Sequence, residues 1–405
     1  MNILVADYIY TPHGYLNNQA VAFTDTIQDI DTLEKLQHKY TEASIVYTEA
    51  NSVLYPGFIN THVHLEFSAN KTSLKYGSFM PWLDSVIKYR EDLVGACNNE
   101  VMIQECESML RSGITTFGAI SSFGNELEVC EKTPQRVVFF NELIGSNAQY
   151  ADMLYADFLE RVKVSESCED SSRIIPAVAI HSPYSVHPVI LEKAVTLAKQ
   201  HKLPLSTHFL ESQAEREWLD KGEGDFKAFF KKFFNTEVPV TNIQEFMYAF
   251  DTYPTHFTHS TQANQVELDY LAQKGHSIAH CPRSNRYLGV GRLPIENLNL
   301  PFTIATDGLS SNDSLSIFDE IRAALLLHNE LPIQELASTL LKSVTSDAAD
   351  ILGLNNGCIK VGKLADFAVV TLPETPKREE EIALWTVLYT KDVTSVYIAG
   401  KKVEL

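Results

Sequence analysis

Short apolar runs alternate with amphipathic stretches between about residues 53 and 350. The amphipathic stretches 188–201, 264–274 and 317–328 have a helical pattern of apolar and polar positions. Strands that alternate with helices form parallel sheets, so the pattern predicts a repeated strand–helix unit. Eight apolar runs are predicted as strands: 53–60, 114–120, 136–143, 174–180, 203–209, 255–260, 277–282 and 302–307.

Eight such units favour a (β/α)8 TIM barrel, and an open doubly wound sheet is the alternative. No Gly-x-Gly-x-x-Gly motif follows any of the runs, which counts against the open sheet. The two ends of the chain are β-type instead, with "LADFAVVTL" and "VTSVYIAGKKVEL" as the clearest strands. We therefore predict a barrel domain over residues 56–353 and a small β-sandwich domain formed jointly by residues 1–55 and 354–405. Residues 220–240 are expected to form an extended loop or short helices.

Composition narrows the class of protein further. The chain has 405 residues, 45% hydrophobic and 21% charged, as in ordinary globular proteins. It shows no export signal and no membrane-spanning run, and its six cysteines are scattered as expected for reduced thiols, so we predict a cytoplasmic location. The net charge of −19 repels phosphate backbones and anionic membranes, so neither nucleic acid nor a membrane is an expected partner. A homodimer is left open, because no heptad or apolar patch marks an interface.

Candidate chemistry gathers at the ends of the predicted strands. In "PGFINTHVHL", His62 and His64 are two residues apart and point to one face of a strand. His208, His259 and Asp307 fall at the ends of the fifth, sixth and eighth runs. Each alone has an ordinary explanation, such as a satisfied polar residue or a turn. Barrel enzymes place their active sites at these strand ends, however, and five placements there are poorly explained by chance.

The set His62-x-His64, His208, His259 and Asp307 resembles the amidohydrolase superfamily of metal-dependent hydrolases. The segments "HFLES", "HCPRSN" and "TDGLSSNDSL" resemble its nucleoside and aminotriazine deaminase branch. The resemblance implies one divalent metal ion per chain, bound by His62, His64, His208 and Asp307. Zinc is the expected ion, and the ligand set also accepts iron.

The resemblance also implies catalytic roles. Glu211 is similar to the proton shuttle of the family, although an acid at a helix start has a structural explanation too. His259 and Asp307 are expected to orient and activate the attacking water. Binuclear relatives carry a bridging lysine at the end of strand 4, where this chain has His181 in "AIHSPYSVHP", so a single metal is implied. A metal in such a site lowers the pKa of water from 15.7 to about 7.

The implied reaction is hydrolytic deamination of an adenine-type nucleoside analogue. "THVHLEFSANKTSL", "FMPWLDSVIKYRE" and "HCPRSNRYLG" are most similar to the 6-aminodeoxyfutalosine deaminases of the futalosine route to menaquinone. Deaminases of adenosine, methylthioadenosine or S-adenosylhomocysteine are the alternative. A binuclear-type cyclic amide hydrolase or a non-enzymatic scaffold is a further, less favoured alternative. The candidate substrate contacts are His181, Trp82, Glu142, Ser146, Arg283 and Arg286.

Three of these candidates have competing explanations. Arg283 and Arg286 lie on one loop of an acidic protein and could bind a substrate carboxylate. The alternative is that they are surface arginines paired with nearby acids. Trp82 could pack against a flat ring or anchor its own loop.

Overall fold

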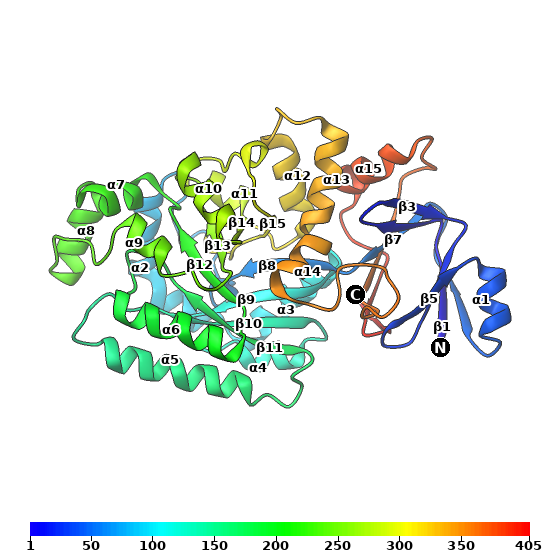
Figure 1. Cartoon of the computed structure of the whole chain (residues 1–405), viewed down its shortest axis with the longest axis horizontal. Helices are drawn as coiled ribbons and strands as arrows, with labels where there is room; N and C mark the ends of the chain where they lie inside the picture. The colour runs from blue at the N-terminus through cyan, green and yellow to red at the C-terminus, as the bar shows by residue number, and fades with distance from the viewer.

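Eight parallel strands form the central sheet of the molecule (Figure 1), in a computed structural model that describes residues 1–405. Strands that are neighbours in sequence are neighbours in the sheet, and all of these pairs are parallel. The (β/α)8 prediction is confirmed. The strands are β8 (Phe58–Val63), β9 (Ile114–Ser121), β10 (Arg136–Leu143), β11 (Ile174–Ile180), β12 (Leu205–Phe209), β13 (His256–His259), β14 (Ser277–His280) and β15 (Phe302–Ile304).

The first and last strands of the barrel meet through polar groups. The backbone N–H of Asp307 donates to the carbonyl of His62 at 3.1 Å. The side chain of Asn60 accepts from the Thr306 N–H at 3.1 Å and donates to the Thr306 hydroxyl at 2.7 Å. Because β8 and the segment that follows β15 make these contacts, the barrel closes at the end where His62 and Asp307 lie.

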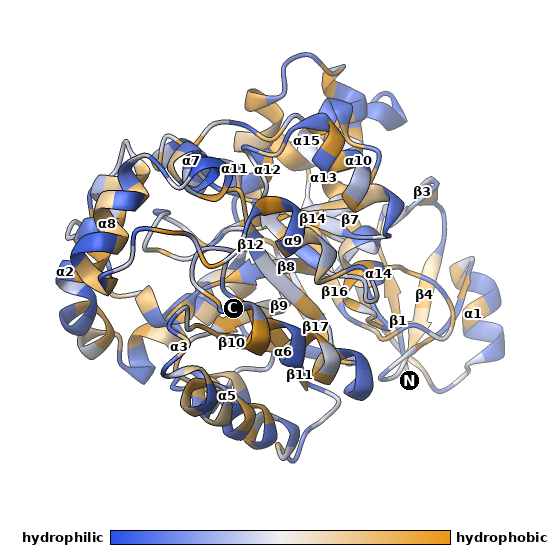
Figure 2. Ribbon diagram, turned by 60° about the vertical axis from the view of Figure 1, so that its left-hand side comes forward, coloured by the Kyte–Doolittle hydropathy of each residue, from blue (hydrophilic) through white to orange (hydrophobic).

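Helices cover the outside of the barrel, and one further helix, α14, packs against the inner face of its sheet. Figure 2 shows hydrophobic and hydrophilic colours alternating along helices such as α5, as expected for amphipathic helices on a core. Ile59 and Phe140, on the inner face of the sheet, pack with Ala348 and Leu352 of α14. The barrel helices are α2 (Phe79–Ala96), α3 (Asn99–Arg111), α4 (Leu127–Lys132), α5 (Ala151–Glu166), α6 (Pro188–His201), α7 (Gln213–Lys221), α8 (Asp225–Phe234), α9 (Ile243–Tyr248), α10 (Gln265–Gln273), α11 (Pro282–Tyr287), α12 (Ile317–Leu327), α13 (Ile333–Ser343) and α14 (Ser346–Leu352), with short 3-10 turns η1 (Leu65–Phe67) and η2 (Ile295–Asn297).

The first predicted strand, 53–60, is wrong as a single strand. The chain breaks at Gly57 into β7 (Ser52–Pro56), which pairs with β16 (Phe367–Thr371), and β8, which pairs with β9. The Thr115 side chain fills the position that a Cβ on Gly57 would need, with its nearest atom 2.0 Å away. Only glycine therefore lets the chain pass between the two sheets at this point.

Two sheets outside the barrel pack face to face as a β-sandwich. Phe23 of the first sheet contacts Phe367 and Tyr397 of the second, with ring centroids 5.2 and 5.8 Å apart. The predicted β-sandwich from both ends of the chain is confirmed, while its division from the barrel at residues 55/56 and 353/354 stays a prediction. The first sheet has the order β5 (Ile27–Asp31), β4 (Ala20–Phe23), β1 (Asn2–Val5), β6 (Ser44–Tyr47), beside α1 (Leu33–Lys39); the second has β18 (Lys401–Val403), β17 (Ser395–Ile398), β16, β7, β2 (Tyr8–Thr11), β3 (Gly14–Asn17).

Two further segments refine the sequence-based expectations. The β-type C-terminal region also contains a helix, α15 (Glu379–Tyr389), which packs on α13. Residues 220–240 contain α8, whose Phe226, Phe229 and Phe230 are buried. None of the helices has the length and apolar character needed to cross a membrane.

Candidate active site

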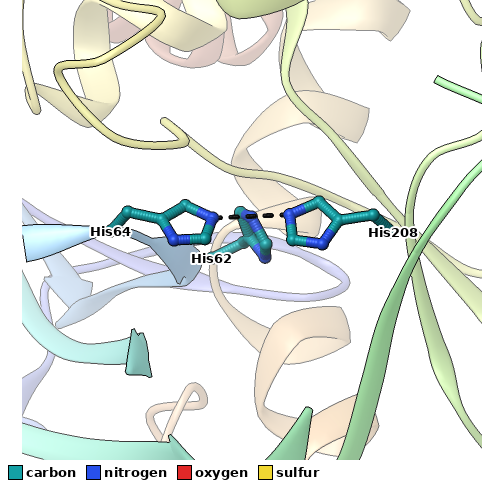
Figure 3. Close-up of side chains that lie close together, drawn as sticks. All are labelled: His62, His64 and His208. Carbon is teal, nitrogen blue, oxygen red and sulfur yellow. Dashed lines mark hydrogen bonds between the residues drawn. The ribbon is translucent and has the colours of Figure 1, made fainter. Parts of the chain in front are cut away.

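Three histidines converge at the carboxyl end of the barrel. His62 lies in β8, His64 follows that strand directly, and His208 lies in β12. Their ring centroids are 4.8 to 5.4 Å apart, and the Nε2 atoms of His64 and His208 are 3.4 Å apart (Figure 3). The structure therefore brings together three of the residues predicted to bind a metal, from two strands that are far apart in the sequence.

Asp307 lies against this cluster, three residues after β15. Its Oδ1 is 3.7 Å from Nε2 of both His62 and His64. Its Oδ2 accepts hydrogen bonds from the hydroxyls of Ser284 and Ser311, each at 2.8 Å. Burial alone would raise the pKa of Asp307, but His64, His259 and these two hydroxyls hold it below its usual value. The carboxylate is therefore ionised and fixed in orientation.

The donor set fits a divalent metal. Nε2 of His62 is buried and has no hydrogen-bond partner in the protein. Nδ1 of His208 donates to the carbonyl of His181 at 2.7 Å, which leaves Nε2 of His208 with a free lone pair. Burial lowers the pKa of both His62 and His208 well below the usual value, so both imidazoles are neutral. Neutral imidazoles beside an ionised carboxylate are the ligands that such a metal requires.

Glu211 and His259 lie beside Asp307. Oε1 of Glu211 is 3.6 Å from Nε2 of His259, which is 3.9 Å from Oδ2 of Asp307. Burial, together with the Asp307 charge, raises the pKa of Glu211 well above its usual value. A carboxyl group with a raised pKa can take up and release a proton near neutral pH, which suits acid–base chemistry.

The backbone at these positions is strained. Leu210, His259, Ser260 and Asp307 have φ values of 44°, 68°, 52° and 59°, in the left-handed region that non-glycine residues rarely adopt. Strain of this kind persists where the surrounding structure enforces it, and it clusters at functional sites. Here it turns His259 and Asp307 toward the three histidines at the ends of their strands.

Glu215 is a residue of the site that the sequence interpretation missed. Its carboxylate accepts the backbone N–H groups of Leu210 at 3.0 Å and Glu211 at 2.8 Å. Ser212 caps the helix α7 on which Glu215 lies, by accepting from the Glu215 N–H at 3.2 Å. Glu215 therefore holds the turn that presents Glu211. The available signal was its spacing, one helical turn after Glu211.

Glu142 and His181, two of the candidate substrate contacts, both lie against His208. Oε1 of Glu142 is 3.9 Å from Nδ1 of His208, and the ring centroid of His181 is 5.3 Å from that of His208. Oε2 of Glu142 accepts from the Ser122 hydroxyl at 2.6 Å, while its buried Oε1 has no partner. The free oxygen is available to a ligand hydroxyl.

Trp82 and Ser146 lie further from the histidines. The indole N–H of Trp82 donates to the carbonyl of Ser310 at 2.8 Å, so this side chain anchors the loop after Asp307. Ser146 borders a cavity of about 280 Å³ that is lined by Tyr184, Trp218 and Phe230, among others. This contact resembles the alternative explanation of Trp82, except that the anchored loop is the one after Asp307 and not its own.

The structure places Arg283 and Arg286 in different environments. The Arg283 guanidinium pairs with Asp313 and lies 3.6 Å from the buried carboxylate of Glu320. Arg286 is exposed, and no ion pair engages it. The expectation that both arginines bind a substrate carboxylate therefore does not suit Arg283, whose guanidinium is already engaged by carboxylates of the protein.

A second unpaired arginine was not anticipated. The Arg90 guanidinium lies 4.6 Å from the ring centroid of Phe123, a side chain that is 40% exposed beyond the end of β9. Burial lowers the pKa of His181, and the Arg90 charge adds to that effect, which places Arg90 within electrostatic reach of the site. Arg90 lies in the segment "FMPWLDSVIKYRE" that carries the family resemblance, but the sequence interpretation named only Trp82 of that segment as a candidate substrate contact.

The family model "Amidohydrolase family" matches residues 53–403, so the chain belongs to the amidohydrolase family. The aminodeoxyfutalosine deaminase of a Nitratiruptor species is 45% identical over 403 residues, 99% of each chain. An adenosine deaminase of Helicobacter pylori is 36% identical over 400 residues, 96% of this chain and 95% of that protein. The solved structure of Helicobacter pylori aminofutalosine deaminase in complex with methylthio-coformycin has a TM-score of 0.95 at 34% identity, with 100% of both chains covered.

These similarities confirm the family and the resemblance to aminodeoxyfutalosine deaminases that the sequence predicted. The match over the full length of both chains includes the sandwich as well as the barrel. The chain is thus similar, from end to end, to deaminases that act on nucleosides.

Proposed function

We propose that this chain is a metal-dependent deaminase that converts 6-aminodeoxyfutalosine to futalosine and ammonia, a step of the futalosine route to menaquinone. The observation that carries the proposal is the placement of Glu211 and His259, 3.6 Å apart, beside Asp307 and the three histidines. Full-length similarity to an aminodeoxyfutalosine deaminase supports the choice of substrate.

In this proposal His62, His64, His208 and Asp307 hold one divalent ion per chain, zinc or iron. The unpartnered Nε2 of His62 and the fixed tautomer of His208 support it. The ion, when bound, supplies a Lewis acid that allows water to ionise near neutral pH. The absence of a lysine at the His181 position supports a single ion.

The protein's own groups would then move the protons. Glu211 takes a proton during attack of water on the ring carbon and delivers it to the adjacent ring nitrogen. The ring carbon gains the oxygen, and its bond to the exocyclic nitrogen breaks. That nitrogen leaves as ammonia with the second proton of the water, which passes from Asp307 through Glu211, so both carboxyl groups return to their starting state. Asp307 accepts a proton from the attacking water, and His259 hydrogen-bonds the oxygen on which charge develops.

Recognition of the substrate would use the remaining rim residues. The unpartnered Oε1 of Glu142 can accept a hydrogen bond from a ribose hydroxyl, and His181 lies beside it. The carboxybenzoyl tail of the substrate is anionic, and the unpaired Arg286 and Arg90 are available to it. Either arginine supplies the local positive charge that a −19 protein needs to attract an anion.

A second candidate function is deamination of adenosine, methylthioadenosine or S-adenosylhomocysteine. It is favoured by the 36% identity to an adenosine deaminase. The two functions share the acid–base groups and differ in the part of the substrate beyond the ribose. The tail-binding arginines therefore distinguish them.

Ammonia release from a panel of amines tests the proposal. The metal-loaded protein is given aminodeoxyfutalosine, adenosine, methylthioadenosine, S-adenosylhomocysteine, guanine and cytosine, with Glu211→Gln as the inactive control. We expect a clear preference for aminodeoxyfutalosine. Equal turnover of methylthioadenosine would favour the second function, and ammonia from none of the compounds would contradict both.

A further inference from the structure

A chain of buried hydrogen-bonding groups leads from His259 away from the metal cluster. Nδ1 of His259 is 2.8 Å from the Asn285 amide oxygen, and the Asn285 amide nitrogen is 3.4 Å from Nδ1 of His280. Nε2 of His280 is 3.0 Å from Nε2 of His328, and Nδ1 of His328 is 2.7 Å from a guanidinium nitrogen of Arg292. The three histidines and Asn285 are buried, and they connect β13, β14, α11 and the end of α12.

Arg292 fixes the direction of these hydrogen bonds at one end. A guanidinium carries only donors, so Nδ1 of His328 must accept from it. Glu296 holds Arg292 in place by accepting from the same nitrogen at 2.9 Å; the carboxylate also lies 3.5 Å from Nδ1 of His328, a longer contact. Burial lowers the pKa of His328 to about 4 and that of His280 well below the usual value, so both rings are neutral. A neutral ring has one donor and one acceptor, and the hydrogen of His328 is therefore on Nε2.

The donor and acceptor in each following hydrogen bond are then determined in turn. His328 donates from Nε2 to Nε2 of His280, so the hydrogen of His280 lies on Nδ1 and needs an acceptor. The Asn285 amide supplies one if it is rotated by 180°, which exchanges its oxygen and nitrogen without changing its shape. In the opposite orientation, two donors would face each other between Asn285 and His280. With its oxygen toward His280, Asn285 donates to Nδ1 of His259, and the hydrogen of His259 lies on Nε2.

The other side of His259 agrees with this assignment. Its Nε2 faces Oε1 of Glu211 at 3.6 Å and Oδ2 of Asp307 at 3.9 Å. Asp307 is ionised and offers only acceptors, so an N–H directed at it is favourable and a lone pair is not. We propose that Arg292, acting through His328, His280 and Asn285, fixes His259 with its hydrogen on Nε2. His259 then faces the reaction as a hydrogen-bond donor, and the other four are positioning residues.

Neutron diffraction tests this inference directly, on deuterium-exchanged crystals of the metal-loaded protein. We expect deuterium on Nε2 of His259 and on Nε2 of His328. Deuterium on Nδ1 of His259, alone or together with Nε2, would overturn the inference. The inference rests on the proposed function for the role of His259, but this readout needs no substrate. Failure of the deaminase proposal and failure of the tautomer assignment are therefore distinguishable.

Kinetics give a second, independent test. Arg292→Met removes the donor to His328, and we expect kcat to fall by about 10- to 100-fold, as for other groups that orient a ligand or base, with KM and metal content within twofold. Arg292→Lys keeps a donor and should recover most of the loss. Arg378→Met is the matched control, because Arg378 also pairs with a glutamate of its own segment, at the distant helix α15. Equal losses in the Met and Lys variants of Arg292, or a loss in Arg292→Met no greater than in the control, would contradict the inference; if Arg292→Met does not fold, the Lys variant and the neutron result decide.

Discussion

The backbone N–H of Asp307 donates to the carbonyl of His62 at 3.1 Å, and this hydrogen bond joins the first barrel strand to the segment that follows the last one. Oδ1 of the same aspartate lies 3.7 Å from Nε2 of the same histidine. Closure of the fold and assembly of the site are therefore one event. A substitution that loosens the β8–β15 contact should disturb the metal cluster before it disturbs the rest of the barrel.

Glu211→Gln should abolish proton transfer while leaving the histidines and Asp307 in place. We expect turnover to fall by about 10²- to 10⁴-fold, the usual contribution of a general acid–base group. Ammonia release measured beside metal content by elemental analysis checks this, since the metal should stay near one ion per chain. Turnover within a few-fold of the parent would show that the proton shuttle is another residue.

Glu215→Gln should weaken the turn that presents Glu211, because each oxygen of the Glu215 carboxyl group accepts one backbone N–H and the amide NH2 group cannot accept. A buried donor left unpaired costs about 1–3 kcal/mol, so thermal unfolding should occur at a lower temperature. We expect kcat to fall and Glu215→Asp to recover part of it. An unchanged kcat would mean that Glu211 is held by other contacts.

The same variant has a predicted pH signature. Burial raises the pKa of Glu215 to about 8 from 4.5, so the folded state keeps a proton that the unfolded state has lost between these values. The contribution of this group to stability is therefore full below about pH 4.5 and declines as the pH rises toward 8. Denaturant unfolding from pH 5 to 8 should show a shallower decline in Glu215→Gln than in the parent.

Substitutions of Arg286 and Arg90 should affect substrate binding, whereas substitution of Arg283 should affect stability. Neutralising Arg286 or Arg90 with glutamine should reduce kcat/KM for aminodeoxyfutalosine by about 10- to 100-fold, since a hydrogen bond to a charged group contributes about 1.5–3 kcal/mol. Turnover of methylthioadenosine, which has no carboxylate, should change little. If kcat/KM falls equally for both substrates, neither arginine binds the carboxylate of the substrate tail.

Arg283→Gln should act on stability instead. Burial raises the pKa of Glu320 to about 8 even beside Arg283, so the substitution leaves a neutral buried carboxyl group short of a hydrogen-bond partner, which costs about 1–3 kcal/mol. Arg378→Gln, which removes an exposed pair, is the control and should cost less than about 1 kcal/mol. Calorimetry of the two variants measures the difference, and a similar midpoint for both would contradict the structural role of Arg283.

Removal of the metal by a chelator should abolish activity and lower the unfolding temperature. A ligand that binds only the folded state stabilises it by about 4 kcal/mol at a thousand times its dissociation constant. Dialysis followed by titration with zinc or iron should restore both properties at one equivalent per chain. Recovery that requires two equivalents would instead indicate a binuclear site.

The sequence predicted the parts of the structure that depend on local pattern. The bounds of β10, β11 and α6 agree with the predicted runs to the residue, because each is a long periodic segment between clear breaks. His62, His64, His208, His259 and Asp307 were placed at strand ends, and the common parallel direction of the strands then brought those ends together.

What the sequence could not supply depends on contacts between distant segments. The break at Gly57 was missed because the apolar run continues through it, and only the Thr115 side chain shows why a glycine is there. The partners of Arg283 lie 30 and 37 residues further along the chain, at Asp313 and Glu320. Local spacing cannot distinguish such an arginine from the unpaired Arg286.

The joint at Gly57 also bears on how proteins of this kind can change. Pro56 ends a strand of the sandwich and Phe58 begins the strand that carries His62, so one residue connects the two sheets. A connection of one residue leaves the two sheets little freedom to shift relative to each other. A sandwich taken from another protein would have to place Phe58 at the same position and with the same chain direction. Otherwise the register of the first barrel strand would change, and His62 and His64 would no longer face Asp307. The outer sheets are thus inherited with the active site rather than exchanged independently of it.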